Sequence, residues 1–509
     1  TGGIVALCSI FSVMSNASLL WSTYEYVPST IRGPSELTSN KQSTGGLDKD
    51  YAMSWSYGKM ETLTLLVPDV YGGSSNAKVG ENSNFGKLLK QYGVPAGQMK
   101  SYLQSAPMYW GDQPFTSGPV YVGAIICLLF VFGMIVIKER WKWWLFAAST
   151  LAIFLAWGKN FAPFNDLFFY YFPGYNKFRS VAMSLVIVQF AFPFMSFMLL
   201  TKILRGEYEK NFLIARLKWS VYITGGLCLI ILLAGTASIG FDFSGTNDAQ
   251  IQKEIIGAVE ADRKSLLQSD AIRSLVFILL GAGLIWAFLT EKIKQNLLIG
   301  GIALLVFIDL FSVGKRYFDD SDFISKNEYS QYFEPTQADQ LILKETSKDY
   351  RVFNLAVNTF ADSHTSYFHK SVGGYHAAKL RRYQEIIEHQ LTKSDSTNTS
   401  GFPFNKPVVD MLNTKYFIVK AKEQEQVIPN TGALDNAWFV RQVKMVDNAD
   451  AEMSALNDFN PAETAIIDRR FSSQLNGFTL SADSTANIML QSYAPNDLIY
   501  QSKSSAENV

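Results

Sequence analysis

The sequence predicts a polytopic α-helical membrane domain, residues 1–314, followed by an α+β domain, residues 315–509. Two observations predict this division: long apolar runs almost free of charge recur up to residue 314, and none occurs beyond residue 315. The averages conceal it, because the mean hydropathy is +0.06 and the formal net charge is zero. Neither domain is strongly basic, so we do not expect nucleic-acid binding.

The apolar runs approach the length of transmembrane helices, since about 20 residues cross a hydrocarbon core about 30 Å thick. They cover residues 1–24, 113–137, 143–158, 180–201, 219–241, 274–290 and 295–314. We therefore expect about seven spans, counting each run once. Thr1 opens directly into the first run, without an initiator Met or the basic start of a signal peptide. This beginning predicts a fragment that lacks earlier spans.

Lysine and arginine residues in the short connections between runs predict the orientation of the chain in the membrane. Basic clusters occupy residues 138–142, 201–218 and 291–295, after the second, fourth and sixth runs, so they share one face. Short loops rich in these residues lie on the cytoplasmic side. We expect the large loop 21–117 and the C-terminal domain to lie on the outer side.

The predicted outer loops contain more aromatic and apolar residues than ordinary connections between helices. Loop 21–117 contains many Trp and Tyr residues, which favours a folded segment, and residues 59–68 predict a helix that Pro68 ends. Apolar residues recur near helical spacing in 245–272. This spacing predicts an amphipathic helix that packs on the protein or lies on the membrane surface, with packing on the protein favoured.

An aromatic stretch, residues 158–179, separates the third and fourth runs. Nine of its 22 residues are aromatic, and Pro163 and Pro173 bracket residues 164–172. Aromatic side chains prefer the headgroup boundary of a membrane. We expect a short interfacial helix, either as a structural belt or as the lateral access path of a lipid.

The C-terminal domain mixes helical and strand-like periods. Helices are expected within 328–345 and 375–393. Strands are expected at 350–357, 415–420, 437–446, 464–468, 477–482 and 486–493. Because the strands gather towards the end, the pattern predicts an α+β domain that ends in a β-rich, sandwich-like sheet.

Histidines and basic residues cluster within this domain. His364, His369, His376 and His389 lack the spacing of a zinc helix motif, so a metal site is not favoured. After Gly373 and Gly374, the helix within 375–393 brings basic side chains close to its start. These side chains are Lys379, Arg381 and Arg382. They oppose the helix dipole, which favours an acidic partner such as a phosphate or the membrane domain, with a solvated basic face as the alternative.

Charged residues beside the predicted spans are the candidate catalytic and binding groups, although interface anchoring explains about half of such residues. The set comprises Glu25, Arg32, Glu61, Asp69, Asp112, Lys159, Asp166, Lys177 and Arg179. Glu25 and Glu61 lie in aromatic or apolar helix-like contexts, and Asp69 begins a turn. Buried carboxylates have raised pKa values and act as general bases, so we predict these three as catalytic candidates. Asp309 lies about one turn from the outer end of the last run, which favours a hydrogen bond near the interface.

Several short motifs together resemble the YfhO family of bacterial multi-pass membrane proteins. They are YEYVPSTIRGPSEL (24–37), YGKMETLTLLVPDVYGG (57–73), FFYYFPGYNKFRSVAMSL (168–185), GGYHAAKLRRYQ (373–384) and DMLNTKYFIV (410–419). The chain carries no Walker loop, no GxGxxG after a strand and no GxSxG elbow, which excludes nucleotide-driven transport of the P-loop type. The family is similar to GT-C glycosyltransferases, which transfer a sugar from a polyprenyl-phosphate carrier on the outer face of the membrane.

The resemblance implies a protein of the bacterial cytoplasmic membrane that uses a polyprenyl-phosphate sugar lipid and a cell-envelope acceptor. GT-C enzymes place their catalytic Asp after the first span, upstream of Thr1 if spans are missing, so no catalytic residue is transferred by motif. Basic side chains or a divalent cation would stabilise the leaving phosphate, and the basic residues are favoured. These are Arg32, Lys159, Lys177, Arg179, Lys379 and Arg382. A lipid or glycan transporter and a non-catalytic envelope scaffold remain the alternatives.

Overall fold

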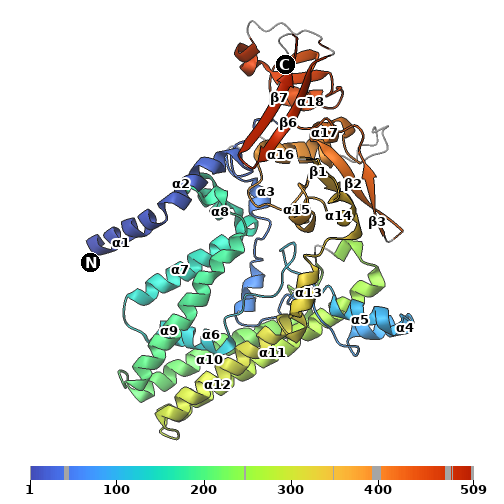
Figure 1. Ribbon diagram of the computed structural model, residues 1–509. Helices are drawn as coiled ribbons and strands as arrows, with labels where there is room; N and C mark the ends of the chain where they lie inside the picture. The colour runs from blue at the N-terminus through green and yellow to red at the C-terminus, as the bar shows by residue number, and fades with distance from the viewer. Residues whose placement is uncertain are drawn as a thin grey trace. The chain divides into compact units, whose positions relative to one another are not determined.

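The computed structural model describes residues 2–38, 45–245, 248–347, 349–392, 403–422, 424–475, 483 and 485–505. The chain divides into two compact units (Figure 1). The helical unit comprises residues 48–323, and the mixed unit comprises residues 1–47 and 324–509. The sequence analysis assigned residues 1–47 to the membrane domain; in the structure they group with the C-terminal residues. Each unit is described by itself.

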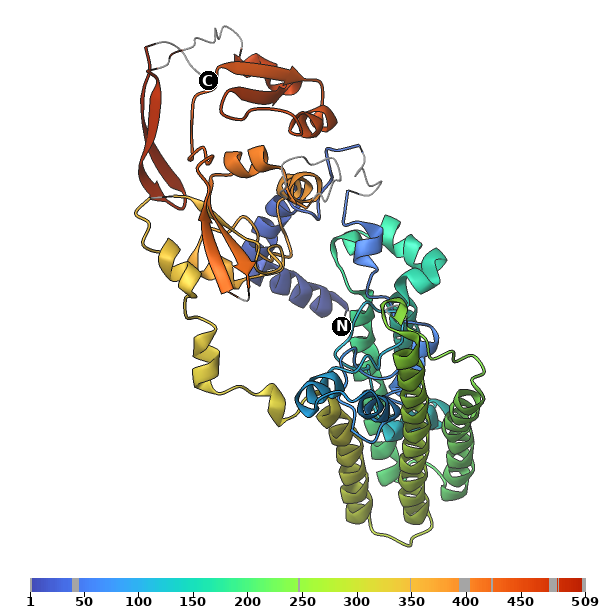
Figure 2. The ribbon, with the colours of Figure 1, turned by 90° about the vertical axis from the view of Figure 1, so that its right-hand side faces the viewer.

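The helical unit is a bundle of long apolar helices (Figure 2). Its main helices are α6 (Ala124–Val136), α7 (Trp141–Ala156), α9 (Val186–Leu204), α10 (Lys210–Ala237), α11 (Lys253–Leu289) and α12 (Gln295–Tyr317). Within the described residues, four segments are long and apolar enough to cross a membrane, namely α9 with the turn before it, α10, α11 and α12. Two bent helix pairs, at residues 2–29 and 141–171, raise the number to six if each is one span. The length and composition of these helices are those of a membrane protein, and the four to six spans among the described residues do not confirm the expected seven.

The second apolar run does not form a span. Only its last part is helical, as α6, whose 13 residues extend about 20 Å at 1.5 Å per residue. Most residues of α6 are buried, and the helix packs against α9, α10, α11 and α12. Residues 113–123 are irregular. The apolar character of this run thus reflects burial inside the bundle rather than exposure to lipid.

The expected amphipathic helix and the sixth apolar run are one continuous helix, α11, of 37 residues. It is about 55 Å long, well beyond the roughly 30 Å of a hydrocarbon core. Its first half packs against α10 and α4 (Asn84–Gln91), with Val259 and Leu267 buried. Packing on the protein, the favoured alternative, is therefore confirmed, but a separate surface helix was wrong.

The segment before α6 is folded, as its aromatic content predicted. It contains α3 (Lys49–Ala52), the 3-10 helix η2 (Met60–Leu65), α4 and α5 (Ala96–Gln104). The helix expected over 59–68 is this short 3-10 helix, and the ring of Trp110 stacks on Tyr71 with centroids 4.2 Å apart. Hydrogen bonds join this segment to the ends of α7 and α12, so it covers one end of the bundle, which we call the loop end.

The aromatic stretch 158–179 forms a short helix, as predicted. After the 3-10 turn η3 (Gly158–Phe161), α8 (Ala162–Tyr171) turns away from α7 by 112°. Its start precedes the expected bound at residue 164, because Pro163 occupies the first turn, where a missing N–H costs nothing. Tyr171 and Phe172 are exposed, as a membrane interface would require, and the interfacial position itself stays a prediction.

The mixed unit contains short helices and small sheets. Its helices are α1 (Gly2–Ser15), α2 (Ala17–Tyr26), η1 (Val27–Ser29), α13 (Lys326–Gln331), α14 (Gln337–Ile342), α15 (His364–Phe368), α16 (Arg381–Ile386), the π-helical turn η8 (Ile387–Leu391), α17 (Lys406–Met411), α18 (Ala449–Ala455) and η9 (Arg469–Leu475). Its strands are β1 (Arg351–Asn354), β2 (Thr414–Ala421), β3 (Gln424–Pro429), β4 (Gln442–Val446), β5 (Thr464–Asp468), β6 (Asn487–Ala494) and β7 (Asp497–Lys503).

The described strands form three separate sheets and not one sandwich-like sheet. In the first, β2 pairs parallel with β1 and antiparallel with β3; β4–β5 is a parallel pair and β6–β7 an antiparallel pair. The expected strand 477–482 lies outside the described residues. Phe353, Phe404 and Phe417 lie in the core beside the first sheet.

Gly235 allows α10 to pack closely on α11. A Cβ atom at Gly235 would lie 2.4 Å from the Leu267 side chain, whereas one at Gly226 of the same helix would meet nothing within 4 Å. We expect Gly235→Val to destabilise the protein by about 1–3 kcal/mol through overpacking, measured by thermal unfolding in detergent. Gly226→Val is the matched control and should leave the transition unchanged; equal effects of both variants would contradict this packing.

Candidate active site

Polar side chains along one side of α11 connect it to the segment 48–123 and, through Arg273, to α12. They are Asp262, Arg263, Asp270, Arg273 and Ser274. Their spacing of seven to eight and then three to four residues keeps them on one helical face. Each pairs with a group on another element, so this face of α11 organises the loop end of the bundle.

Arg263 is fully buried, with 0 % of its surface exposed. Its Nη2 and Nε donate to the carbonyls of Pro107 and Met108 at 2.6 and 3.1 Å, and its Nη1 donates to the carbonyl of Phe243 at 2.7 Å. Both guanidinium ends also bind the carboxylate of Asp248, at 2.6 and 3.0 Å. The backbone of residues 107–109 is thereby fixed to α11.

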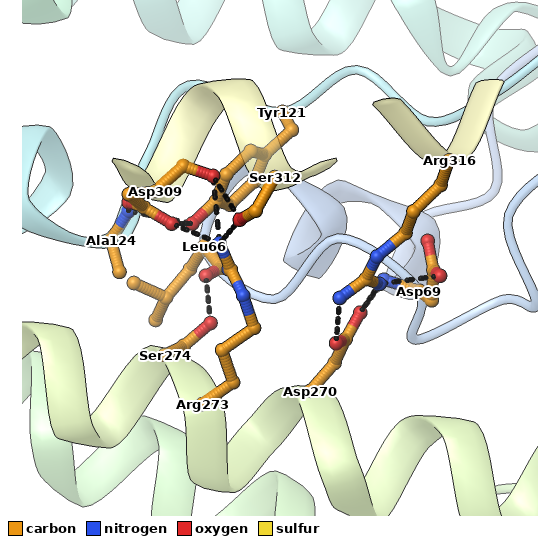
Figure 3. Close-up of polar contacts among 10 residues, drawn as sticks. All are labelled: Leu66, Asp69, Tyr121, Ala124, Asp270, Arg273, Ser274, Asp309, Ser312 and Arg316. Carbon is orange, nitrogen blue, oxygen red and sulfur yellow. Dashed lines mark hydrogen bonds and ion pairs between the residues drawn. The ribbon is translucent and has the colours of Figure 1, made fainter. Parts of the chain in front are cut away.

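A second cluster contains Asp69, one of the predicted catalytic carboxylates (Figure 3). Arg316 of α12 binds both oxygens of Asp270 at 2.7 and 2.8 Å and Oδ2 of Asp69 at 2.8 Å. The hydroxyl of Tyr317 donates to the other oxygen of Asp69, which is 3 % exposed. Burial and the neighbouring Asp270 carboxylate raise the pKa of Asp69. Because both of its oxygens are engaged, Asp69 is placed to join α12 to α11 rather than to accept a substrate proton.

Asp309 caps the start of α6 (Figure 3). Its carboxylate accepts from the backbone N–H of Ala124 at 2.9 Å, from the Tyr121 hydroxyl at 2.7 Å, and from Arg273 at 2.9 Å. The hydrogen bond predicted for Asp309 is confirmed. Nearby, Ser274 donates to the carbonyl of Leu66 at 2.9 Å.

Glu61, another predicted catalytic carboxylate, is buried in the loop end with 2 % exposure. It accepts from the backbone N–H of Gly58 at 2.8 Å, from the Tyr109 hydroxyl at 2.8 Å and from the Gln113 amide at 3.0 Å. Burial raises the pKa of Glu61, and the hydrogen bonds from Gly58, Tyr109 and Gln113 oppose that rise. Glu61 is therefore engaged by its surroundings on both oxygens, and it orders the loops around it.

Asp112 lies next to Glu61 but is exposed. Its Oδ2 accepts from the amide of Asn160 at 3.0 Å, and the same amide donates to the carbonyl of Tyr57 at 2.9 Å. A Cβ atom at Gly58 would lie 2.9 Å from Asp112 Oδ2 and 3.3 Å from Glu61 Oε2. The two carboxylates thus flank Gly58, one buried and one open to solvent. This arrangement separates a buried carboxylate with several donors from one that is accessible from solvent.

Two lysines are next in sequence to residues that contact this pair: Lys59 follows Gly58, and Lys159 precedes Asn160. Lys59 is exposed, with its Nζ 5.5 Å from the centre of the Phe161 ring. Lys159 is exposed, its backbone N–H donates to Ser56 at 2.8 Å, and its ammonium group has no partner among the described residues. Asp112, Lys59 and Lys159 therefore combine an accessible carboxylate with two accessible cations.

Lys177 and Arg179 follow α8 in the same unit. The Arg179 guanidinium donates to the Tyr51 hydroxyl at 2.6 Å and lies 4.8 Å from the ring centre of Trp55. Trp55 in turn donates to the carbonyl of Phe115 at 3.2 Å. Arg179 thus belongs to the loop assembly that carries Asp112, while Lys177 is half-buried in the 3-10 turn η4 (Tyr175–Lys177).

The remaining predicted site residues belong to the mixed unit. Glu25 is exposed and accepts from the Trp21 indole at 2.7 Å, and Arg32 donates to the carbonyl of Ala377 at 3.4 Å. Lys379 lies over the ring of Phe360, and burial lowers its pKa. Arg382 pairs with Glu452 at 3.2 Å. The structure therefore does not gather all predicted site residues in one unit.

The histidines form no metal site in the part of the chain that the structure describes, and no group of three or more His, Cys, Asp or Glu side chains there is placed to hold a metal ion. His369 is buried and pairs with Asp339 through a 2.9 Å contact. Comparison with protein-family models, with curated proteins and with solved structures found no match to this chain. The function must therefore be argued from the geometry of the loop end.

Sequence reasoning did not single out the two central residues of this site. Asp112 was one of several charged residues near the spans, and its partner Asn160 lies 48 residues away. Arg263 stood within a helix expected to carry solvated charges. The proximity of the sequence WGD to a predicted apolar run was the available signal for Asp112, and nothing local indicated Arg263.

The buried guanidinium provides a test of this organisation. We expect Arg263→Met to destabilise the helical unit by about 3–5 kcal/mol, because it leaves the buried Asp248 carboxylate unpaired. Thermal unfolding measures the loss, and hydrogen exchange should show faster exchange at residues 105–113. Lys264→Met, on the adjacent position with a longer 3.3 Å contact to Ser238, is the control; equal behaviour of the two variants would contradict the role of Arg263.

Proposed function

We propose that the protein is a YfhO-like membrane glycosyltransferase. It transfers a sugar from a polyprenyl-phosphate donor to a cell-envelope glycan, polymer or lipid at the outer face of the bacterial cytoplasmic membrane. The observation that carries the proposal is the exposed Asp112 carboxylate beside the exposed lysines 59 and 159, held at one end of an apolar helical bundle. A lipid-linked donor needs this combination, because its tail stays in the bilayer while its phosphate meets cations at the surface.

The chemistry assigned to these groups is an inverting displacement. Asp112 accepts the proton of an acceptor hydroxyl, whose oxygen attacks C1 of the donor sugar. The bond between C1 and the phosphate oxygen breaks, and its electron pair leaves with the lipid phosphate. Lys59 and Lys159 offset the negative charge that develops there. Glu61 keeps the loops in place and takes no proton, because its oxygens already accept from Gly58, Tyr109 and Gln113.

The aromatic helix α8 supports a lipid donor in this scheme. It follows Lys159 directly, and its exposed rings include Tyr170 and Tyr171. Aromatic rings at a membrane interface would lie beside the polyprenyl chain and membrane lipids, with the phosphate at the lysines. The proposal assigns leaving-group stabilisation to the lysines, with a divalent cation as the alternative, so transfer should persist in EDTA if the lysines suffice.

A transporter or flippase is the second candidate, and the short helix α6, which begins inside the bundle, favours it. The backbone N–H of its first residue, Ala124, donates to Asp309, within a bundle that also holds the pairs Arg273–Asp309 and Arg316–Asp270. Interrupted helices with charged partners line substrate paths in transporters. Lipid scrambling by the protein in liposomes, without any sugar transfer, would favour this function over the first.

The accessible carboxylate should be essential for transfer. In proteoliposomes with a labelled polyprenyl-phosphate sugar and envelope extract, we expect Asp112→Asn to lower kcat by about 10²–10⁴-fold, the usual contribution of a general base. Asp166→Asn, which removes a carboxylate paired with Lys49, should retain activity. Wild-type activity in Asp112→Asn, or no transfer by the unmodified protein, would refute the proposal.

Donor binding should depend on the cations near Asp112. We expect Lys159→Ala and Arg179→Glu to raise KM for the lipid donor about tenfold or more, since a charge-assisted hydrogen bond contributes about 1.5–3 kcal/mol. Lys138→Ala, an exposed lysine between α6 and α7, is the control. Unchanged KM in Lys159→Ala would remove this side chain from the donor site, and unchanged KM in Arg179→Glu would leave Arg179 a packing partner of Trp55.

A further inference from the structure

A cavity of about 540 Å³ lies inside the mixed unit. It is half open, it is lined by residues of α16, α18 and β5 and by residues 36–37, and its walls are mostly apolar. Aromatic residues Tyr383, Trp438 and Phe459 contribute to the lining. Small-molecule sites are typically apolar cavities of about 300–1,000 Å³ with a few polar groups that fix the ligand. The polar groups of this cavity therefore indicate which ligand it suits.

One of these groups is the carboxylate of Glu385, which is only 3 % exposed and lines the cavity. Its Oε1 accepts from the Ser35 hydroxyl at 2.5 Å, and Ser35 in turn accepts from the backbone N–H of Leu37 at 3.0 Å. Among the described residues, Oε2 has no hydrogen-bond or ion-pair partner. A carboxylate in apolar surroundings is stabilised by a cation, and Glu385 lines the cavity with one oxygen available to accept.

The other charged residues of the lining are compensated. Glu36 pairs with Arg470 at 2.5 Å, and Arg382 pairs with Glu452 at 3.2 Å. These pairs involve partly exposed side chains. Within the part of the chain that is described, Glu385 is therefore the charge of the lining that no cation offsets, which favours a positively charged ligand.

The aromatic side chains favour the same kind of ligand. The Trp438 indole N–H donates to the carbonyl of Pro461 at 2.8 Å, and the Tyr383 hydroxyl donates to the carbonyl of Val372. Their polar edges are thus engaged while the rings line the cavity. Aromatic faces attract organic cations, best at Trp, and sites for alkylated ammonium groups combine such rings.

We propose that this cavity binds a small organic ammonium compound with apolar substituents. The ammonium group lies beside Glu385, and the substituents pack against Trp438, Tyr383 and Phe459. The inference rests on groups of the mixed unit alone, whereas the transferase proposal rests on Asp112 and lysines of the helical unit. Either can therefore fail without the other.

Calorimetric titration of the full chain in phosphatidylglycerol nanodiscs tests the cavity, with empty nanodiscs as background. The probe is benzyltrimethylammonium, and benzyl alcohol and benzenesulfonate are its neutral and anionic counterparts. We expect saturable binding of the cation that exceeds binding of either counterpart at least tenfold. Glu385→Gln should weaken it about tenfold or more, because interactions with a charged group contribute about 1.5–3 kcal/mol.

Glu388→Gln is the matched control, since Glu388 is exposed on the next turn and accepts from Gln384 at 2.9 Å. It should bind the cation as the wild type does. Equal affinity of Glu385→Gln and wild type, or equal binding of benzyl alcohol and the cation, would overturn the proposal. If Glu385→Gln loses its folded circular-dichroism signal, Ile466→Trp decides, because it fills the cavity and leaves Glu385 intact: lost binding supports the site, and full binding overturns it.

Discussion

The loop end of the helical unit depends on the buried side chain of Arg263. A guanidinium with no exposed surface is tolerated only when its donors are paired, and here carbonyls of two separate loops and the Asp248 carboxylate provide the partners. Both loops are thereby tied to one rigid helix. Tyr109, whose carbonyl also accepts from Arg263, donates to Glu61, and Asp112 comes three residues later. The position of the accessible carboxylate thus derives from a charge on α11.

Further along α11, buried ion pairs likewise position the short helix α6. The first N–H groups of a helix lack partners within it, and such groups need acceptors where water is scarce. Asp309 provides one at Ala124, and Arg273 offsets the charge of Asp309. Arg316 joins Asp69 to Asp270 in the same region. These ion pairs allow a helix to begin inside the bundle, and they explain why a long apolar run yields a helix of only 13 residues.

Local periodicity predicted much of the fold, including α9, α10 and α12, the aromatic helix α8 and most strands of the mixed unit. Local periodicity failed where a partner far away in the sequence determines whether a residue is buried or exposed. In the sequence, Asp262, Arg263 and Asp270 look like solvated charges of a surface helix that is separate from the sixth apolar run. In the structure their partners bury them, and α11 runs through both segments as one helix. The apolar character of residues 113–123 likewise reflects their burial, and these residues do not form a helix. Asp112 acquires its place from Asn160, a partner that no spacing in the sequence indicates.

Burial alone does not decide what a carboxylate does, as Glu61 and Glu385 illustrate. Both are almost fully buried, and both lie in mainly apolar surroundings. Neither the sequence context nor the exposed fraction therefore distinguishes the roles of these two residues. Glu61 accepts from a backbone N–H, a hydroxyl and an amide, and a further ligand would have to displace one of these. Glu385 accepts from Ser35, and its second oxygen, unpaired among the described residues, borders a cavity. The inventory of donors around each oxygen therefore separates the carboxylate that holds a loop from the one that can hold a ligand.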